Sequence, residues 1–139
     1  MNRILITGDR NWTNRKLIEQ FIDALRPDLI IEGGARGADT MAREICEARN
    51  IDFLDMPADW DQFPRSAGPI RNREMLVEAK RLGVNLVVAF HNDIVHSKGT
   101  ADMVTISRKA GIPIMIVSEG LTGTAAVSFV SGKVEGKLI

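Results

Sequence analysis

Short apolar runs alternate with segments of helical periodicity, and this alternation constrains the fold more than any other feature of the sequence. Most of these runs are apolar at consecutive positions, as in strands that are buried on both faces of a sheet. Between the runs, apolar residues recur every three or four positions, which is typical of helices. The five predicted strands are Ile4–Ile6, Leu29–Ile31, Ile51–Leu54, Leu86–Phe90 and Ile112–Val117.

Four helices are predicted between these strands. They cover residues 17–25, 41–48, 69–82 and 100–110; Thr13 is the expected N-cap of the first, Pro27 its stop, and Pro69 suits the first turn of the third. Strictly alternating strands and helices favour a parallel sheet with helices on both faces. Right-handed crossovers then favour a doubly wound, Rossmann-like α/β fold of strand order 3-2-1-4-5, with ligands beyond the carboxyl ends of the strands, at the switch point between strands one and four.

The last part of the chain departs from this repeat. Ala125–Val130 and Val134–Ile139 flank Ser131–Lys133, a pattern that predicts a β-hairpin. Such a hairpin could extend the sheet, cover an edge or join subunits. We therefore expect one domain, with residues 1–117 as its body and residues 118–139 as a hairpin extension.

The composition indicates the class of protein but says little about its function. The 139 residues carry a formal net charge of zero, so no global basic field favours nucleic acid. The single cysteine, Cys46, excludes an internal disulfide and is expected to be a buried structural thiol. No signal peptide is recognised, and no apolar run approaches the length of roughly 20 residues that spans a bilayer, so a cytoplasmic location is expected, away from membranes.

A glycine-rich turn follows the second predicted strand and opens the second helix. It contains Gly33, Gly34 and Gly37, whose backbone would let a phosphate approach closely, with N–H groups directed at it. Arg36 could pair with that phosphate. Asp39 could contact the ligand or cap the helix, and the sequence leaves both readings open.

Three other strand ends carry polar residues that a nucleotide could contact. Gly8, Asp9 and Arg10 follow the first strand, where the alternative is a capping turn with a solvated arginine. The irregular connection after the third strand holds Trp60, which could stack on a base or anchor the loop. The remaining predicted contacts are Gly68, Arg71 and Asn72 at the third helix and Gly99 and Thr100 at the fourth.

Arg71 stands in the first turn of the third predicted helix, where a cation opposes the helix dipole, so an anionic ligand explains it better than stability does. His91 and His96 lack supporting ligands at metal-binding spacing, and no metal site is predicted. The sequence thus predicts a phosphate-binding edge and no metal or other cofactor.

The four strand ends together resemble the SLOG superfamily of Rossmann-like domains, which includes the lonely-guy phosphoribohydrolases. Ile6–Arg10, Gly33–Asp39, Gly68–Met75 and Gly99–Met103 are most similar to its small YspA-like (YpsA-related) branch, which also occurs in phages. The resemblance covers about residues 3–117. It implies a nucleotide-binding domain, a bacterial or phage source and a homo-oligomer.

The resemblance also separates two functions. The hydrolases carry an R-K-x-x-M motif, to which Arg71–Met75 is similar, and a P-G-G-x-G-T-x-x-E motif whose glutamate is Met103 here. The first hypothesis is therefore a sensor or sequestering protein for an ADP-ribose-like or other nucleotide ligand. The alternative is hydrolysis of nucleoside 5′-monophosphates, with Arg71 and either Asp102 or Glu74 as catalytic residues. A third hypothesis, single-stranded nucleic-acid binding, is disfavoured by the neutral charge and the few aromatics.

Overall fold

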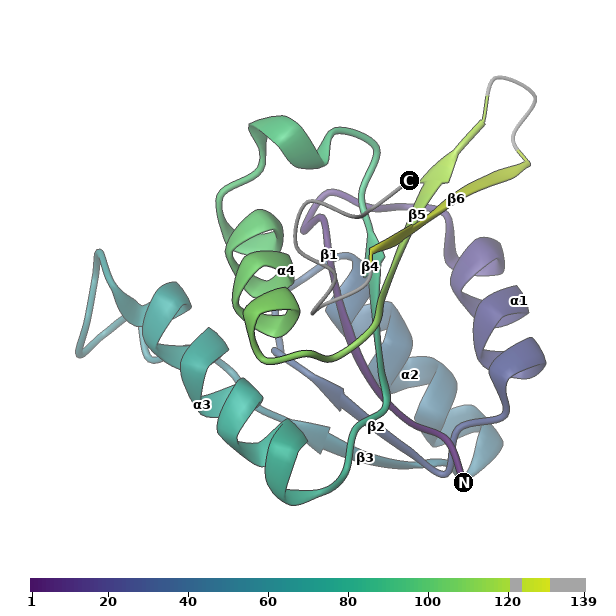
Figure 1. The fold of residues 1–139 in the computed structure, drawn as a ribbon, viewed down its shortest axis with the longest axis horizontal. Helices are drawn as coiled ribbons and strands as arrows, with labels where there is room; N and C mark the ends of the chain where they lie inside the picture. The colour runs from purple at the N-terminus through teal and green to yellow at the C-terminus, as the bar shows by residue number, and fades with distance from the viewer. Residues whose placement is uncertain (121–123, 131–139) are drawn as a thin grey trace.

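The computed structural model describes residues 1–120 and 124–130, which form one twisted sheet between two layers of helices (Figure 1). The strand order is β3-β2-β1-β4-β5-β6, so the predicted order 3-2-1-4-5 is confirmed and extended by one strand. The strands β1 to β5 are parallel, and β6 runs antiparallel to β5. Their bounds are β1 Arg3–Gly8, β2 Leu29–Glu32, β3 Asp52–Asp55, β4 Leu86–Phe90, β5 Ile114–Glu119 and β6 Ala125–Val130.

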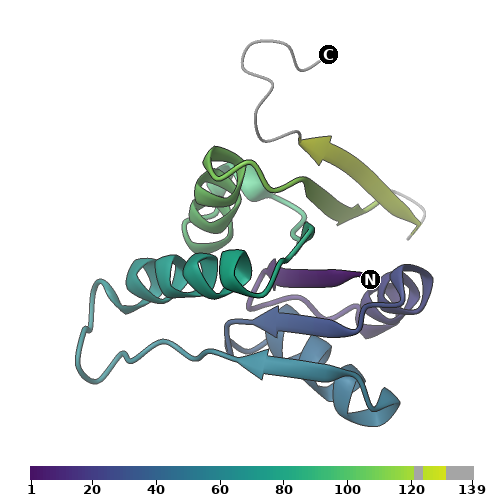
Figure 2. The ribbon, with the colours of Figure 1, turned by 60° about the horizontal axis from the view of Figure 1, so that its bottom comes forward.

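Helices cover both faces of the sheet, as the alternation predicts (Figures 1 and 2). Successive residues of a strand point to opposite faces of the sheet. Ile4 and Ile6 of β1 therefore pack with α1 and α2, whereas Leu5 packs with α3 and α4. The helices are α1 Arg15–Leu25, α2 Ala38–Arg49, α3 Ala67–Arg81 and α4 Gly99–Lys109, with a short 3-10 helix at Ile94–His96.

The helix ends differ in detail from the prediction. Asn14, not Thr13, caps α1, because its side-chain oxygen accepts the N–H of Leu17 at 3.0 Å. The third helix begins at Ala67, so Pro69 still lies in its first turn, where a missing N–H costs nothing. Both shifts are within the one or two residues by which helix ends are commonly displaced.

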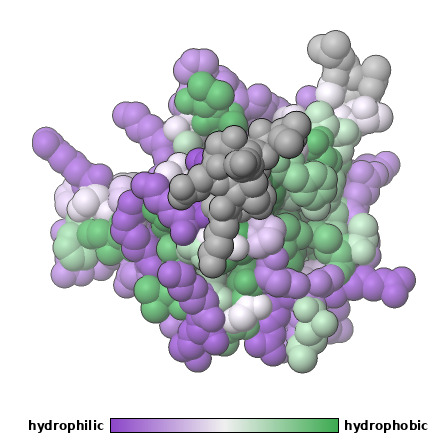
Figure 3. Space-filling model, in the orientation of Figure 1, coloured by the Kyte–Doolittle hydropathy of each residue, from purple (hydrophilic) through white to green (hydrophobic). Residues whose placement is uncertain are grey.

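The C-terminal strand forms its hairpin with β5. Ser118 pairs with Ala126 and Ile114 with Val130, so β6 extends the sheet beyond its predicted last strand. The sequence suggested residues 134–139 as the partner of this strand, and that segment lies outside the described residues. Phe129 of β6 is 71% exposed, and Figure 3 shows apolar side chains gathered where β5, β6 and α1 lie in that view.

The core confirms a structural role for the cysteine. Cys46 is fully buried on the α1–α2 side, and burial raises the pKa of its thiol to about 12. A thiol that stays protonated is a poor nucleophile. Among the helices in the described part of the chain, none is both long and apolar enough to cross a membrane.

Candidate ligand-binding site

A cavity of about 360 Å³ opens beyond the carboxyl ends of β1, β2 and β3. It falls within the size range of small-molecule sites. Among the described residues, the charged side chains in its wall all belong to arginines, and no carboxylate lines it. Its wall consists of Arg10, Gly33, Gly34, Ala35, Arg36, Pro57, Ala58, Trp60 and Arg71.

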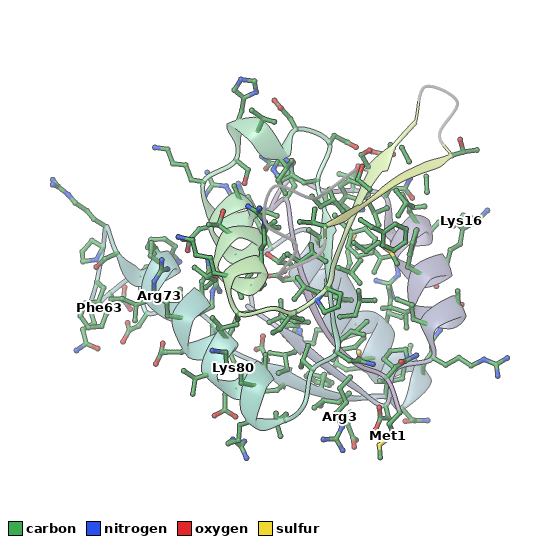
Figure 4. All side chains as sticks on the ribbon, in the orientation of Figure 1. Met1, Arg3, Lys16, Phe63, Arg73 and Lys80 are labelled. Atoms are coloured by element: carbon green, nitrogen blue, oxygen red, sulfur yellow. The ribbon has the colours of Figure 1, made fainter. Side chains whose placement is uncertain are left out.

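The cavity does not lie at the predicted switch point between β1 and β4. It lies one strand further along, between the turns that follow β1 and β2 and the connection from β3 to α3. That connection projects beyond the start of α3 (Figures 1 and 2). Phe63 belongs to it, and Figure 4 shows this residue on the opposite side of the molecule from Lys16 of α1. The cavity is formed because this long connection supplies Pro57, Ala58 and Trp60 as a third wall.

The glycine turn holds its shape through carboxylates of the protein itself. The N–H of Gly34 donates to Glu32 Oε2 at 2.6 Å, and the N–H of Ala35 donates to Asp39 Oδ2 at 3.3 Å. The N–H of Ala38, at the start of α2, donates to the carbonyl oxygen of Asp9 at 3.2 Å. The amides of Gly34, Ala35 and Ala38 therefore already have acceptors within the protein, and the positive charge at this site comes from arginines.

Two of these arginines have unpaired guanidinium groups. Arg10 follows β1 and Arg36 lies in the glycine turn, and both are exposed. Within residues 1–120 and 124–130, neither side chain makes a hydrogen bond or an ion pair. Two unpaired cations at the wall of one cavity are well placed to receive an anion.

Arg71 reaches the cavity from α3 and also braces its walls. Its Nη1 donates to the carbonyl of Gly33 and, at 3.4 Å, to the carbonyl of Met56, while its Nε donates to Asn72 Oδ1 at 3.1 Å. A Cβ on Gly33 would lie only 2.5 Å from Arg71 Nη1, so the guanidinium packs on the bare glycine backbone. Arg71 thus links the turn after β2 to the connection after β3.

Trp60 stands at the rim of the cavity with its indole 54% exposed. The ring packs on Gly68 at the start of α3, where an added Cβ would lie 3.3 Å from Trp60 Cη2. Both sequence-based readings are compatible with this position, because the contact anchors the loop and leaves a large part of the ring available. Stacking of a base on Trp60 stays a prediction.

The two tryptophans make that prediction measurable. Trp12 is 3% exposed, packs on Phe90 and donates its indole N–H to the carbonyl of Asn14 at 2.9 Å. We expect a nucleotide to quench fluorescence from Trp60 and not from Trp12. A titration should show quenching in the Trp12→Phe variant and none in the Trp60→Phe variant. Equal quenching in both would place the base elsewhere.

Three carboxylates lie behind the turn, and sequence reasoning missed two of them, Glu32 and Asp55. Glu32 is fully buried; burial and a hydrogen bond to Asp55 raise its pKa to about 9, so it is neutral at pH 7. Burial raises the pKa of Asp39 to about 7, against the attraction of Arg71. One sequence signal could have identified Glu32. It is an acidic residue that directly follows an apolar strand and directly precedes two glycines.

Removing the ionisable group at Glu32 should flatten the pH dependence of stability. The folded protein holds this proton up to about pH 9, whereas the ordinary pKa is 4.5, so stability is lost as pH rises between these values. The loss is at most about 1.4 kcal/mol per pH unit. Glu32→Gln can accept the N–H of Gly34 and does not ionise, so its melting temperature should fall less than that of the wild type from pH 5 to pH 9. If the melting temperatures of the variant and the wild type fall equally over this pH range, Glu32 is not a buried, protonated acid.

Several other predicted contacts lie beside the cavity and not in its wall. Gly8 packs under Phe90 and Ala38, with which an added Cβ would clash at 2.6 and 2.7 Å. Asp9 accepts the N–H of Asn11 at 2.9 Å, and its Oδ2 lies 3.9 Å from His91 Nε2. Gly37 supports the start of α2. Their contact with a ligand stays a prediction.

The residues of the fourth strand end form a separate network. Asn72 is buried and donates to the carbonyl of Gly99 at 3.2 Å and to Asp102 Oδ2 at 3.0 Å. Arg73, labelled in Figure 4, pairs with Asp102 at 2.9 Å. Burial raises the pKa of Asp102, but its hydrogen bonds from Arg73 and Asn72 leave the value below the ordinary one. Gly99 and Asp102 are therefore brought together with Asn72, and neither they nor Thr100 line the cavity.

The proposed catalytic acids are not in the cavity wall either. Glu74 is exposed on α3, and its side chain makes no hydrogen bond to any described residue. Met103, which occupies the position of the hydrolases' glutamate, is fully buried between α3 and α4. A catalytic role for Asp102 or Glu74 stays a prediction. Among the residues that the structure describes, no group of three His, Cys, Asp or Glu side chains is placed to hold a metal ion.

Comparison with known proteins agrees with the motifs. No curated protein matches the chain. The model of one family, described as the YspA, cpYpsA-related SLOG family, matches residues 2–63, just under half of the chain. The matched part contains every residue of the cavity wall except Arg71, and it supports a general role in binding or processing a nucleotide-related ligand. Through these residues the chain is similar to the YspA, cpYpsA-related SLOG family.

Proposed function

We propose that this protein binds a phosphorylated nucleoside or a nucleotide-derived molecule of the ADP-ribose type, as a sensor or sequestering module. One observation carries the proposal: Arg10, Arg36 and Arg71 line the same cavity, and no carboxylate of residues 1–120 and 124–130 does. The whole chain has a net charge of zero, so this concentration of positive charge is local. A local cluster of arginines favours a compact anion such as a phosphate group.

The cavity offers complementary partners for both halves of such a ligand. Arg10 and Arg36 are free to form paired hydrogen bonds with phosphate oxygens. Trp60 at the rim presents an aromatic face on which a base can stack. Pro57 and Ala58 add small apolar surface next to it.

Binding is favoured over hydrolysis because the wall of the cavity lacks an acid. Cleavage of an N-glycosidic bond passes through a positively charged sugar, which a neighbouring carboxylate stabilises. Asp102 is bonded to Arg73 and Asn72, and Met103 replaces the glutamate of the hydrolases. These positions support a protein that holds its ligand intact.

Hydrolysis of nucleoside 5′-monophosphates is the second candidate, and the position of Arg71 favours it. This residue, in the segment similar to the hydrolases' arginine motif, does reach the cavity. Base release by the wild type, lost in Arg71→Lys with the fold retained, would establish this alternative. The lysine variant is preferable to alanine because Arg71 also braces two loops.

A thermal-shift screen tests the proposal. The ligands are nucleoside monophosphates, NAD, ADP-ribose, its cyclic isomers and a single-stranded oligonucleotide, with products identified by chromatography. A ligand at 100 times its dissociation constant stabilises by roughly 2.7 kcal/mol, which is readily measured. Stabilisation with recovery of the intact small molecule supports the proposal. Free base would indicate the hydrolase, a shift with the oligonucleotide alone would indicate nucleic-acid binding, and no shift at all would reject a nucleotide site.

We also propose a homo-oligomer in a cytoplasmic setting. Sedimentation measurements test the first part, and a strictly monomeric protein at high concentration would reject it.

A further inference from the structure

Asp39 is a buried carboxylate directly behind the cavity. It is the second residue of α2 and only 5% exposed. Its Oδ2 accepts the N–H of Ala35 at 3.3 Å, whereas its Oδ1 is buried without a hydrogen-bond partner among the described residues. A buried carboxylate oxygen that lacks a donor is costly, so the ionised form depends on a nearby positive charge.

Arg71 supplies that charge beside Gly33. A Cβ placed on Gly33 would lie 2.5 Å from Arg71 Nη1 and 3.0 Å from Asp39 Oδ2, so both side chains approach the same face of this glycine. No hydrogen bond joins the two side chains within the described part of the chain. Their attraction is therefore electrostatic and does not depend on a direct hydrogen bond.

The other titratable groups that face Asp39 are carboxyl groups. Glu32, from β2, is protonated at neutral pH, whereas Asp55, from β3, disfavours a negative charge on Asp39. Arg71, from α3, is the cation that favours that charge. Burial raises the pKa of Asp39, and Arg71 and the backbone hydrogen bonds lower it, which together place the pKa at about 7.

We infer that Asp39 is a positioning residue that holds the Arg71 guanidinium against the glycine turn and takes up a proton when an anion enters the cavity. This inference rests on the proposed function. The geometry gives the reason: Arg71 lines the cavity and approaches Gly33 from the same side as the buried carboxylate, so a bound anion competes for the same positive charge. Once the anion neutralises Arg71, the negative form of Asp39 loses its stabilising partner, and the proton comes from solvent.

The sign of the pH dependence follows from this competition. A negative ligand raises the pKa of Asp39 above its value in the free protein, so binding and protonation favour each other. Affinity for an anion should therefore rise as pH falls from 8 to 6. This direction is informative because a phosphate monoester loses negative charge over the same interval and would bind less tightly.

Sulfate is the appropriate probe, because it remains a dianion throughout this range. Isothermal titration of the wild type should give binding about fivefold tighter at pH 6 than at pH 8. Near pH 7, buffers with different ionisation heats should reveal net proton uptake on binding. Asp39→Asn keeps an oxygen that can accept the N–H of Ala35 but cannot ionise, so its affinity should be the same at both pH values. Both histidines are intact in this variant.

A matched control and a direct readout complete the test. Asp23→Asn removes an exposed carboxylate on α1 and should retain the pH dependence of the wild type. The side-chain carboxyl carbon of Asp39, followed by NMR in the wild type, should titrate about one pH unit higher when sulfate is present. This measurement does not need the Asp39→Asn variant to fold.

The outcomes separate the inference from the function on which it rests. An unchanged Asp39 titration in the presence of bound sulfate, or the same pH dependence in Asp39→Asn as in the wild type, would overturn the inference and leave the binding site standing. If neither sulfate nor any nucleotide binds the wild type between pH 6 and pH 8, the proposed function fails, and the inference falls with it.

Discussion

Replacing Gly37 by alanine is expected to destabilise the protein by at least about 3 kcal/mol and to lower its melting temperature on the order of 10 °C. Gly37 has φ 79° and ψ −126°, a conformation that residues with a side chain rarely adopt. A Cβ at this position would also lie 2.5 Å from the carbonyl oxygens of Asp9 and Arg10. Those atoms belong to the backbone, so the clash requires the turn after β1 to move away from α2.

The matched control is Gly99→Ala. Gly99 is the first residue of α4, lacks a positive φ, and has no atom within 4 Å of an added Cβ. Thermal unfolding of this variant should be close to that of the wild type. Similar melting temperatures for Gly37→Ala and the wild type would show that the contact between the two turns is not required for the fold.

The double variant Arg10→Ala/Arg36→Ala is expected to weaken nucleotide binding about 100-fold or more. A hydrogen bond to a charged group contributes roughly 1.5–3 kcal/mol, so each arginine should account for at least about tenfold. Neither side chain makes a hydrogen bond or ion pair with another described residue, so stability should be unchanged. Titration with the best ligand from the thermal-shift screen measures the effect.

Arg108→Ala controls for the loss of positive charge in general. Arg108 is exposed in the last turn of α4, does not line the cavity, and should leave affinity unchanged apart from a small effect at low salt. If the double variant binds as tightly as this control, the ligand does not contact the two free arginines, and the cavity is not the binding site.

The fold was largely predictable because its signals are local. Runs such as Leu86–Phe90 are apolar at every position, which few structures other than a strand buried on both faces require, and the right-handed crossover rule then leaves few strand orders. The pairing of β6 was not predictable from its own residues. Val130 packs against the α3–α4 core, and that preference depends on a surface that other segments create.

The sequence predicted which charged residues belong to the candidate site better than it predicted where the cavity lies. The glycines and Arg36 stand in one continuous motif, so they could be recognised together. Glu32 and Asp55 form a pair only because β2 and β3 are adjacent and in register at this point. The displacement of the cavity from the β1–β4 switch point likewise results from how the β3–α3 connection folds, and an irregular segment of that length has no periodicity from which its path can be read.

The brace that Arg71 forms has a consequence for how this site can be transplanted. The part of the chain that matches the family ends at residue 63, yet the guanidinium that joins two walls of the cavity comes from the next helix. A fragment or chimera cut at the boundary of the family match would inherit Arg10, Arg36 and Trp60 but not the side chain that holds the turn and the long connection together. The smallest portable unit of this binding site therefore extends at least through α3.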